Sequence, residues 1–168
     1  MALVVSTIHH HLISKKLRSR ASIVCISGDC IEDHHFAVLI ALGASAIYPI
    51  GSYTMIQRNN PDSDLYSKLD NYRHSIEKGL LKIMSKMGIS TLTSYHGSML
   101  LHTIGLGKTL SEEYFPSIPS IFGGIEIEDI EKSLKKTIKL RDENIQSKDL
   151  KEIGLFRYRK FGEAHGYS

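Results

Sequence analysis

The chain has 168 residues, a length that fits one domain or one domain with a short appendage. Its net charge is only +3 and its basic residues are scattered, which does not fit the dense basic stripe of a nucleic-acid-binding protein. No apolar run approaches the roughly 20 residues that a membrane span needs, and the start lacks the basic region of a signal peptide. Two cysteines are too few for a disulfide scaffold, so the sequence predicts reduced thiols and a cytoplasmic protein.

The first part of the chain alternates between patterns typical of strands and of helices. Asp29 and Glu32 resemble a capping box, and Gly43 is a typical helix terminator. We therefore predict strands over residues 2–6, 21–27 and 45–48, and helices over residues 8–18 and from about 30 to 42.

The second part begins with a long amphipathic pattern in which apolar residues recur every three or four positions. A β-branched run follows it, and two prolines interrupt the chain further on. We predict helices over residues 64–87, 99–104 and 127–144, a strand over residues 89–93, and a short hairpin at the C-terminal end.

Short buried strands that alternate with helices indicate an α/β fold with parallel strands and right-handed crossovers. Four strands are too few for a complete barrel of about 250 residues. The sequence therefore predicts parallel β/α units in an open sheet or a partial barrel, flanked by helices, with a C-terminal helix and a short hairpin. Functional groups of such folds gather where the strands end.

Four groups of residues suggest chemistry and also have simpler explanations. His9, His10 and His11 are consecutive on a predicted helix, so they point in different directions and cannot bind one metal together; His9 is expected to face inward and His11 outward. Cys30 lies near a helix start, where a thiol pKa can fall, but a buried structural role is the simpler interpretation. Gly105 and Gly107 lack the spacing of a phosphate-binding loop. The polar run from Ser94 to Gly97 is either a turn or part of a site.

Several stretches together resemble the large subunit of glutamate synthase. They are VSTIHHHLISKKLRSRASIV, SGDCIEDHHFAVLIALGASAIYP, NYRHSIEKGLLKIMSKMGISTLTSY and the closing GLFRYRKFGEAHGYS, in the order found in that family. The resemblance places the chain at the C-terminal part of the central domain and the start of the FMN-binding synthase domain. It divides the chain into a central-domain-like α/β unit, residues 1–125, and a linker helix with the start of a synthase-like segment, residues 126–168.

The resemblance implies a reaction that yields two glutamates from glutamine, 2-oxoglutarate and a reductant. In the family, an amidotransferase domain releases ammonia, which travels through a tunnel to a barrel domain with FMN and a 3Fe-4S cluster. The central domain joins the two and helps to line the tunnel. We therefore expect the partners to be the amidotransferase and synthase domains, and we expect no FMN, cluster or metal in this chain itself.

This chain lacks the residues that react in the family. Its residue 1 is Met rather than the amidotransferase cysteine, and it has two cysteines where the cluster needs three. His96, Met99 and His102 stand where the family typically has an arginine, a glutamine and an acidic residue. No catalytic, cofactor-binding or metal-binding residue is therefore predicted.

Our interpretation is a structural, tunnel-forming part of a glutamate-synthase-like protein that is not catalytic by itself. The alternatives are a free-standing scaffold or interaction module, or a small-molecule-binding protein that uses the segment from Tyr95 to Gly97. We also expect residues 146–168 to pack little against residues 1–120 and to dock on a second copy, giving a homodimer. Because each is predicted to follow a parallel strand, the residues expected to line one shared cavity are Ser6, Thr7, Ser27, Ser94, Tyr95 and His96.

Overall fold

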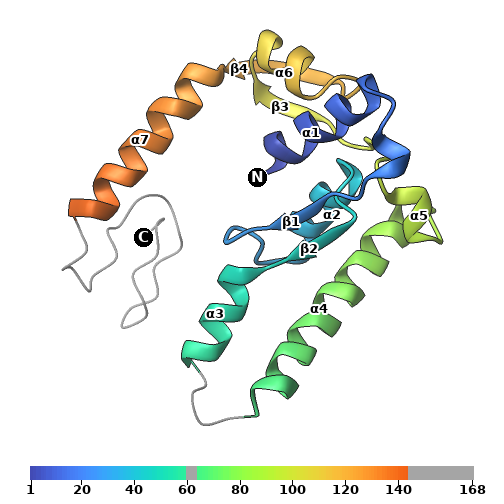
Figure 1. Ribbon diagram of the computed structural model, residues 1–168, viewed down its shortest axis with the longest axis vertical. Coiled ribbons are helices and arrows are strands. Elements are labelled where there is room, and N and C mark those ends of the chain that lie inside the picture. Colours follow the sequence, from blue (N-terminus) through green and yellow to red (C-terminus); the bar gives the residue numbers. More distant parts are fainter. Residues whose placement is uncertain (60–63, 144–168) are drawn as a thin grey trace. The chain divides into compact units, whose positions relative to one another are not determined.

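The structure, a computed structural model, describes residues 1–59 and 64–143. It confirms the α/β class: the described residues form seven α-helices and two small parallel sheets of two strands each, with no closed barrel. They fall into two compact units that divide between Glu126 and Ile127. In chain order the elements of the first unit are α1 (Ala2–Ser14), the 3-10 helix η1 (Arg18–Arg20), β1 (Val24–Ile26), α2 (Asp33–Ala41), β2 (Ala46–Tyr48), α3 (Ile50–Asn59), α4 (Leu65–Lys86), α5 (Leu92–Tyr95), β3 (Thr103–Leu106), α6 (Lys108–Tyr114) and β4 (Ser120–Ile125) (Figure 1).

One β/α unit has the topology that the sequence predicts. Strands β1 and β2 pair in parallel, with Cys25 opposite Ile47, and α2 connects them. Glu32 begins α2 in a capping box with His35, so the box lies one turn later than the pair predicted from Asp29 and Glu32. Gly43 ends the helix region with a φ of +107°, as its sequence position indicates.

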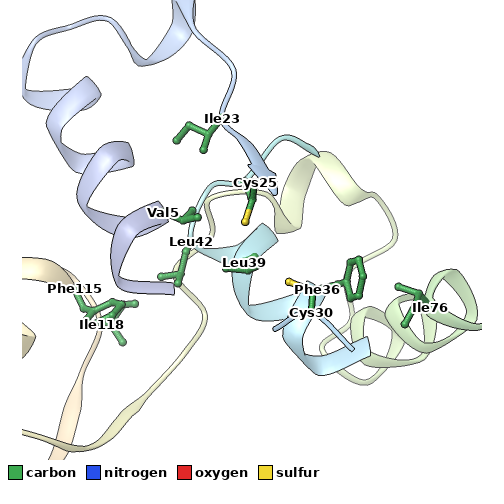
Figure 2. Close-up of a cluster of buried hydrophobic side chains, with 11 residues drawn as sticks. Val5, Ile23, Cys25, Cys30, Phe36, Leu39, Leu42, Ile76, Phe115 and Ile118 are labelled. Carbon is green, nitrogen blue, oxygen red and sulfur yellow. The ribbon is translucent and has the colours of Figure 1, made fainter. Parts of the chain in front are cut away.

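Helix α2 lies at the centre of the hydrophobic core. Its residues Phe36 and Leu39 pack with Val5 of α1 and with both cysteines, as Figure 2 shows. A second buried cluster joins Ala41 of α2 to Met84 of α4 and Tyr95 of α5. The long helix α4 is thereby fixed along α2, and Asp64 caps its start by accepting a hydrogen bond from the Ser67 amide.

The predicted strand over residues 2–6 is wrong, because these residues begin α1. Val4 and Val5 are β-branched and favour a strand locally, but Val5, Ser6 and His9 share one buried face at helical spacing. Packing of that face against the core therefore decides the local structure.

The predicted strand over residues 89–93 is also wrong. Thr91 begins the short helix α5 instead, and its hydroxyl lies 2.8 Å from the Ser94 hydroxyl. Tyr95 at the end of this turn is only 2% exposed, and burying such a large ring outweighs the β-branched preference of the preceding residues.

The predicted helix over residues 99–104 is wrong because strand β3 occupies residues 103–106. Met99 has a positive φ of +53°, which ends any helix there. Gly105 does not terminate a helix; it lies within β3 at a register irregularity, where a Cβ on Gly124 of β4 would overlap the Gly105 carbonyl. Strand β4 and helix α3 were not predicted at all.

The second unit is described here only through helix α7 (Ile127–Glu143), which confirms the predicted amphipathic helix. Ion pairs one turn apart support it, between Asp129 and Lys132 and between Glu131 and Lys135. The predicted hairpin and the expected docking of residues 146–168 lie outside the described residues. The assignment of residues 1–125 and 126–168 to two family domains stays a prediction.

Candidate functional site

A connected group of polar contacts in the first unit surrounds Arg18. We call it the Arg18 cluster, and it consists of Arg18, His9, Gly43, His96 and Gly97. The Arg18 guanidinium donates to His9 Nδ1 at 3.0 Å, to the Ala21 carbonyl at 2.7 Å and to the Gly43 carbonyl at 2.8 Å. One side chain thus joins α1, η1 and the end of α2.

His96 completes the cluster from the end of α5. Its Nε2 lies 3.1 Å from the Gly43 carbonyl, and because that oxygen can only accept, we assign the Nε2 proton as the donor. The amide of Gly97 donates to the Ile40 carbonyl at 2.9 Å, and the amide of Met99 donates to the Ala41 carbonyl at 3.1 Å. The carbonyl groups at the buried C-terminal end of α2 are therefore satisfied by Arg18, by His96 and by the segment that follows α5.

Two glycines make room for the His9 ring. A Cβ on Gly43 would overlap the ring, and a Cβ on Gly97 would lie 3.3 Å from its Cε1. His9 is only 8% exposed, which confirms the prediction that it faces inward, while His11 on the same helix is exposed.

The surroundings of His9 keep its imidazole neutral. Burial, together with the positive charge of Arg18 and the neighbouring His10 and His96, lowers its pKa from 6.5 to about 4. Nδ1 accepts from Arg18, so the ring proton is assigned to Nε2. His9 is therefore suited to accepting a structural hydrogen bond near neutral pH.

This pKa leads to a prediction about stability and pH. Between pH 6.5 and about pH 4 the unfolded chain binds a proton at His9 that the folded chain does not, so stability falls as the pH falls through this window. We expect chemical denaturation to show about 2 kcal/mol less stability from this group at pH 4.5 than at pH 7.

The matched variants for this test are His9→Gln and His11→Gln. The first should remove most of the pH dependence in this window, whereas the second should keep it because His11 is exposed. A His9→Gln protein with the full pH dependence would show that other groups cause it.

The six residues predicted to line one cavity lie in different settings. Only Ser27 directly follows a parallel strand; it is buried, and its hydroxyl accepts a hydrogen bond from the Asp29 amide at 3.1 Å. Ser6 is buried in α1 and donates to the Tyr114 carbonyl at 2.6 Å, while Thr7 is exposed on the same helix.

The other three lie in or just after α5. Ser94 is exposed, Tyr95 is buried, and His96 belongs to the Arg18 cluster. The prediction of a shared cavity rests on all six residues directly following parallel strands, and of the six only Ser27 does so. The tunnel lining stays a prediction. Arg18 stands in an ordinary basic run, so its sequence position does not single it out, and the sequence predicts Gly43 only as a helix terminator.

Two cavities of similar size open on the first unit. One, of about 620 Å³, lies between α6 and β4 and is lined by residues such as Ser111, Phe115 and Ser120. The other, of about 600 Å³, follows β2 and is bounded by α2, α4 and α5. Of the six predicted lining residues, only His96 borders either of them.

Neither cavity contains a group of metal ligands. Across residues 1–59 and 64–143, no three His, Cys, Asp or Glu side chains lie where they could hold a metal ion. Cys25 and Cys30 are free thiols in the apolar core, 4% and 2% exposed, and burial is the main cause that raises the Cys25 pKa. These cysteines do not fit an iron–sulfur cluster. The described helices also include none that is long and apolar enough to cross a membrane.

Residues 1–107 match the family described as the glutamate synthase central domain. The chain belongs to this family. It is 38% identical over 177 residues to the ferredoxin-dependent glutamate synthase of Antithamnion sp., a match that covers 97% of this chain and 12% of that protein. The glutamate synthase [NADPH] large chain of Bacillus subtilis is 36% identical over 170 residues, covering 99% of this chain and 11% of that one. The glutamate synthase [NADH] of Schizosaccharomyces pombe is 36% identical over 167 residues, a match that covers 94% of this chain and 8% of that protein.

The glutamate synthase relatives extend well past this match. The chain spans about a tenth of their length. Their names give three different reductants, so this segment accompanies more than one electron donor in the family.

Proposed function

We propose that the chain is a structural, tunnel-forming segment of a glutamate-synthase-like protein and is not catalytic by itself. The observations that carry this proposal are the match of residues 1–107 to the central-domain family and the match of nearly the whole chain to one segment of the relatives. The reaction of the larger protein would then form two glutamates from glutamine, 2-oxoglutarate and a reductant, in domains outside this chain.

The Arg18 cluster supports a structural role. Its hydrogen-bonding groups are directed at one another and at main-chain carbonyls, so they connect α1, α2 and α5. Tyr95 is buried and Gly97 faces the His9 ring. The segment from Tyr95 to Gly97 therefore serves mainly to pack against the rest of the unit. The FMN and the iron–sulfur cluster implied by the family would be held by other domains of the same protein, which are the proposed partners.

Assays of the purified chain test whether it is catalytic by itself. We expect no visible flavin absorbance after gel filtration and no glutamate formation from 2-oxoglutarate and ammonia with a chemical reductant. Stoichiometric flavin that survives gel filtration, or steady turnover, would contradict the proposal.

The tunnel part of the proposal needs a larger protein. We define the hybrid large chain as the Bacillus subtilis large chain in which this chain replaces the segment that it matches. Small hydroxyl side chains suit a neutral, hydrogen-bonding passenger such as ammonia. If Ser94 borders the tunnel, Ser94→Leu should lower glutamine-dependent glutamate formation roughly tenfold and leave ammonia-dependent formation unchanged.

Ser90→Leu is the matched control, because Ser90 is also exposed and lies four residues before Ser94. It should leave both activities unchanged. Equal loss of both activities in Ser94→Leu would indicate damage to folding or docking. No loss of either activity would show that Ser94 does not border the tunnel.

A further inference from the structure

The cavity beside β2 follows the strand along its free edge. We call this cavity the β2 groove. Its lining includes five of the six residues from Ala44 to Pro49, so the strand itself forms one wall. The remaining lining comes from four helices: Phe36 and Ile40 of α2; Tyr53 of α3; Tyr72, Arg73, Ile76, Glu77 and Leu80 of α4; and Leu92, Thr93 and His96 in or next to α5.

Several polar side chains around the β2 groove already have partners. The Tyr72 hydroxyl donates to the Ile31 carbonyl at 2.9 Å. Arg73 forms ion pairs with Asp70 at 2.7 Å and Glu77 at 2.6 Å on its own helix. A charged small molecule would have to compete with these contacts, whereas an apolar occupant would lie against Ile76, Leu80 and the other apolar walls.

The main chain of β2 offers hydrogen bonds toward the β2 groove. The Ser27 amide donates to the Tyr48 carbonyl, and the Ala46 amide donates to the Ile23 carbonyl at 3.3 Å, so these two residues face β1. Orientations alternate along a strand, so the amide and carbonyl of Ile47 face away from β1. Within the described residues β2 pairs with no strand except β1.

The sheet is also too small and too exposed to be complete. The register places Val24 opposite Ala46 and Ile26 opposite Tyr48, and on this shared face Val24 and Ile26 are 64% and 59% exposed. Parallel sheets are normally covered on both faces, and a two-stranded sheet is only marginally stable alone.

We propose that the β2 groove receives an extended, apolar segment of the glutamate synthase large chain, from the part outside this chain, which pairs with β2 as a further strand. The inference rests on the proposed function, because it places this chain within that larger polypeptide. The chain spans about a tenth of the length of its relatives, so most of the large chain is available to supply the strand. Main-chain hydrogen bonds to Ile47 give affinity, and the apolar walls select apolar side chains.

Hydrogen exchange of the peptide that contains residues 44–49 tests this proposal. In the isolated chain the Ile47 amide should exchange rapidly, because it faces the open groove. In the hybrid large chain the same amide should exchange at least about tenfold more slowly. Equal exchange in both proteins would overturn the proposal. Protection in the isolated chain that disappears on dilution would also overturn it, because a second copy would then fill the groove.

A groove-filling variant provides an independent measurement. Thr93 is exposed and lines the groove, so Thr93→Trp should leave the stability of the isolated chain unchanged but remove the protection of Ile47 in the hybrid large chain. Ser90→Trp is the matched control, since Ser90 is exposed and does not line the groove, and it should keep the protection. Full protection in Thr93→Trp would contradict the proposal.

These readouts separate the inference from the proposed function. An inactive hybrid large chain in which Ile47 is protected would contradict the proposed function and support the strand pairing. An active hybrid in which Ile47 exchanges freely would support the proposed function and contradict the strand pairing.

Discussion

Replacing Gly43 with alanine is expected to lower the free energy of unfolding by about 3 kcal/mol or more. Two effects add at this position. The φ of +107° is unfavourable for any residue with a Cβ, which costs about 1 kcal/mol. The new methyl group would also overlap the His9 ring, so the ring must move and its hydrogen bond with Arg18 must break.

Gly88→Ala separates the two effects. Gly88 has a φ of +72°, but no atom lies within 4 Å of the position that its Cβ would occupy. This variant should therefore lose only about 1 kcal/mol. Urea denaturation followed by circular dichroism measures both changes.

The double variant His9→Ala with Gly43→Ala should lose less free energy of unfolding than the sum of the losses of the two single variants, because removing the ring removes the overlap. Equal losses for the two glycine variants would contradict the packing described for His9.

Replacing Arg18 with methionine should lower the free energy of unfolding by about 2 to 4 kcal/mol. Methionine keeps much of the apolar stem but removes the donors to His9, Ala21 and Gly43. Hydrogen bonds to charged groups contribute about 1.5 to 3 kcal/mol each, and the buried carbonyl of Gly43 keeps His96 as a donor, which limits the loss.

Arg20→Met is the matched control for this prediction. Arg20 lies in the same 3-10 helix and is exposed, so its replacement should change the stability by less than about 0.5 kcal/mol. Arg18→Met should also raise the pKa of His9, because it removes a neighbouring positive charge. A titration of the His9 imidazole by nuclear magnetic resonance would show this change. An Arg18 variant as stable as the Arg20 variant would contradict the role of the Arg18 cluster.

The sequence predicts best those elements whose local pattern and tertiary packing agree. The long apolar repeat of α4 and the glycine that follows it predict both ends of that helix to within one residue. Strands β1 and β2 are predicted because each is a short apolar run closed by a turn residue.

The failures occur where distant contacts decide the local structure. Residues 2–6 and 89–93 have β-branched sequences, yet burial of Val5 places residues 2–6 in α1. Burial of Tyr95 places residues 92 and 93 in α5, and residues 89–91 lie in neither a helix nor a strand. Gly105 is typical of a helix terminator, and only its close approach to Gly124 shows why it belongs to a strand. Because the tunnel residues were chosen from predicted strand ends, these errors removed the geometric basis for five of the six.

The Arg18 cluster shows the same limit at the level of a site. His9 is predicted to face inward from its helical position, and this is confirmed. Its partners Arg18, Gly43 and His96 are 9, 34 and 87 residues away in sequence, so no local pattern connects them. The family resemblance, by contrast, depends on residue identity along the whole chain, and the comparisons confirm it.

The rate of glutamine-dependent glutamate formation by the hybrid large chain is the most direct measurement of the central claim. If this chain is a structural segment of a glutamate synthase central domain, the hybrid should keep activity within about tenfold of the unmodified Bacillus subtilis large chain, measured with the same reductant and partner subunit. The same hybrid with Gly43→Ala should lose activity, because the segment no longer packs. A stably folded hybrid that forms no glutamate would contradict the claim.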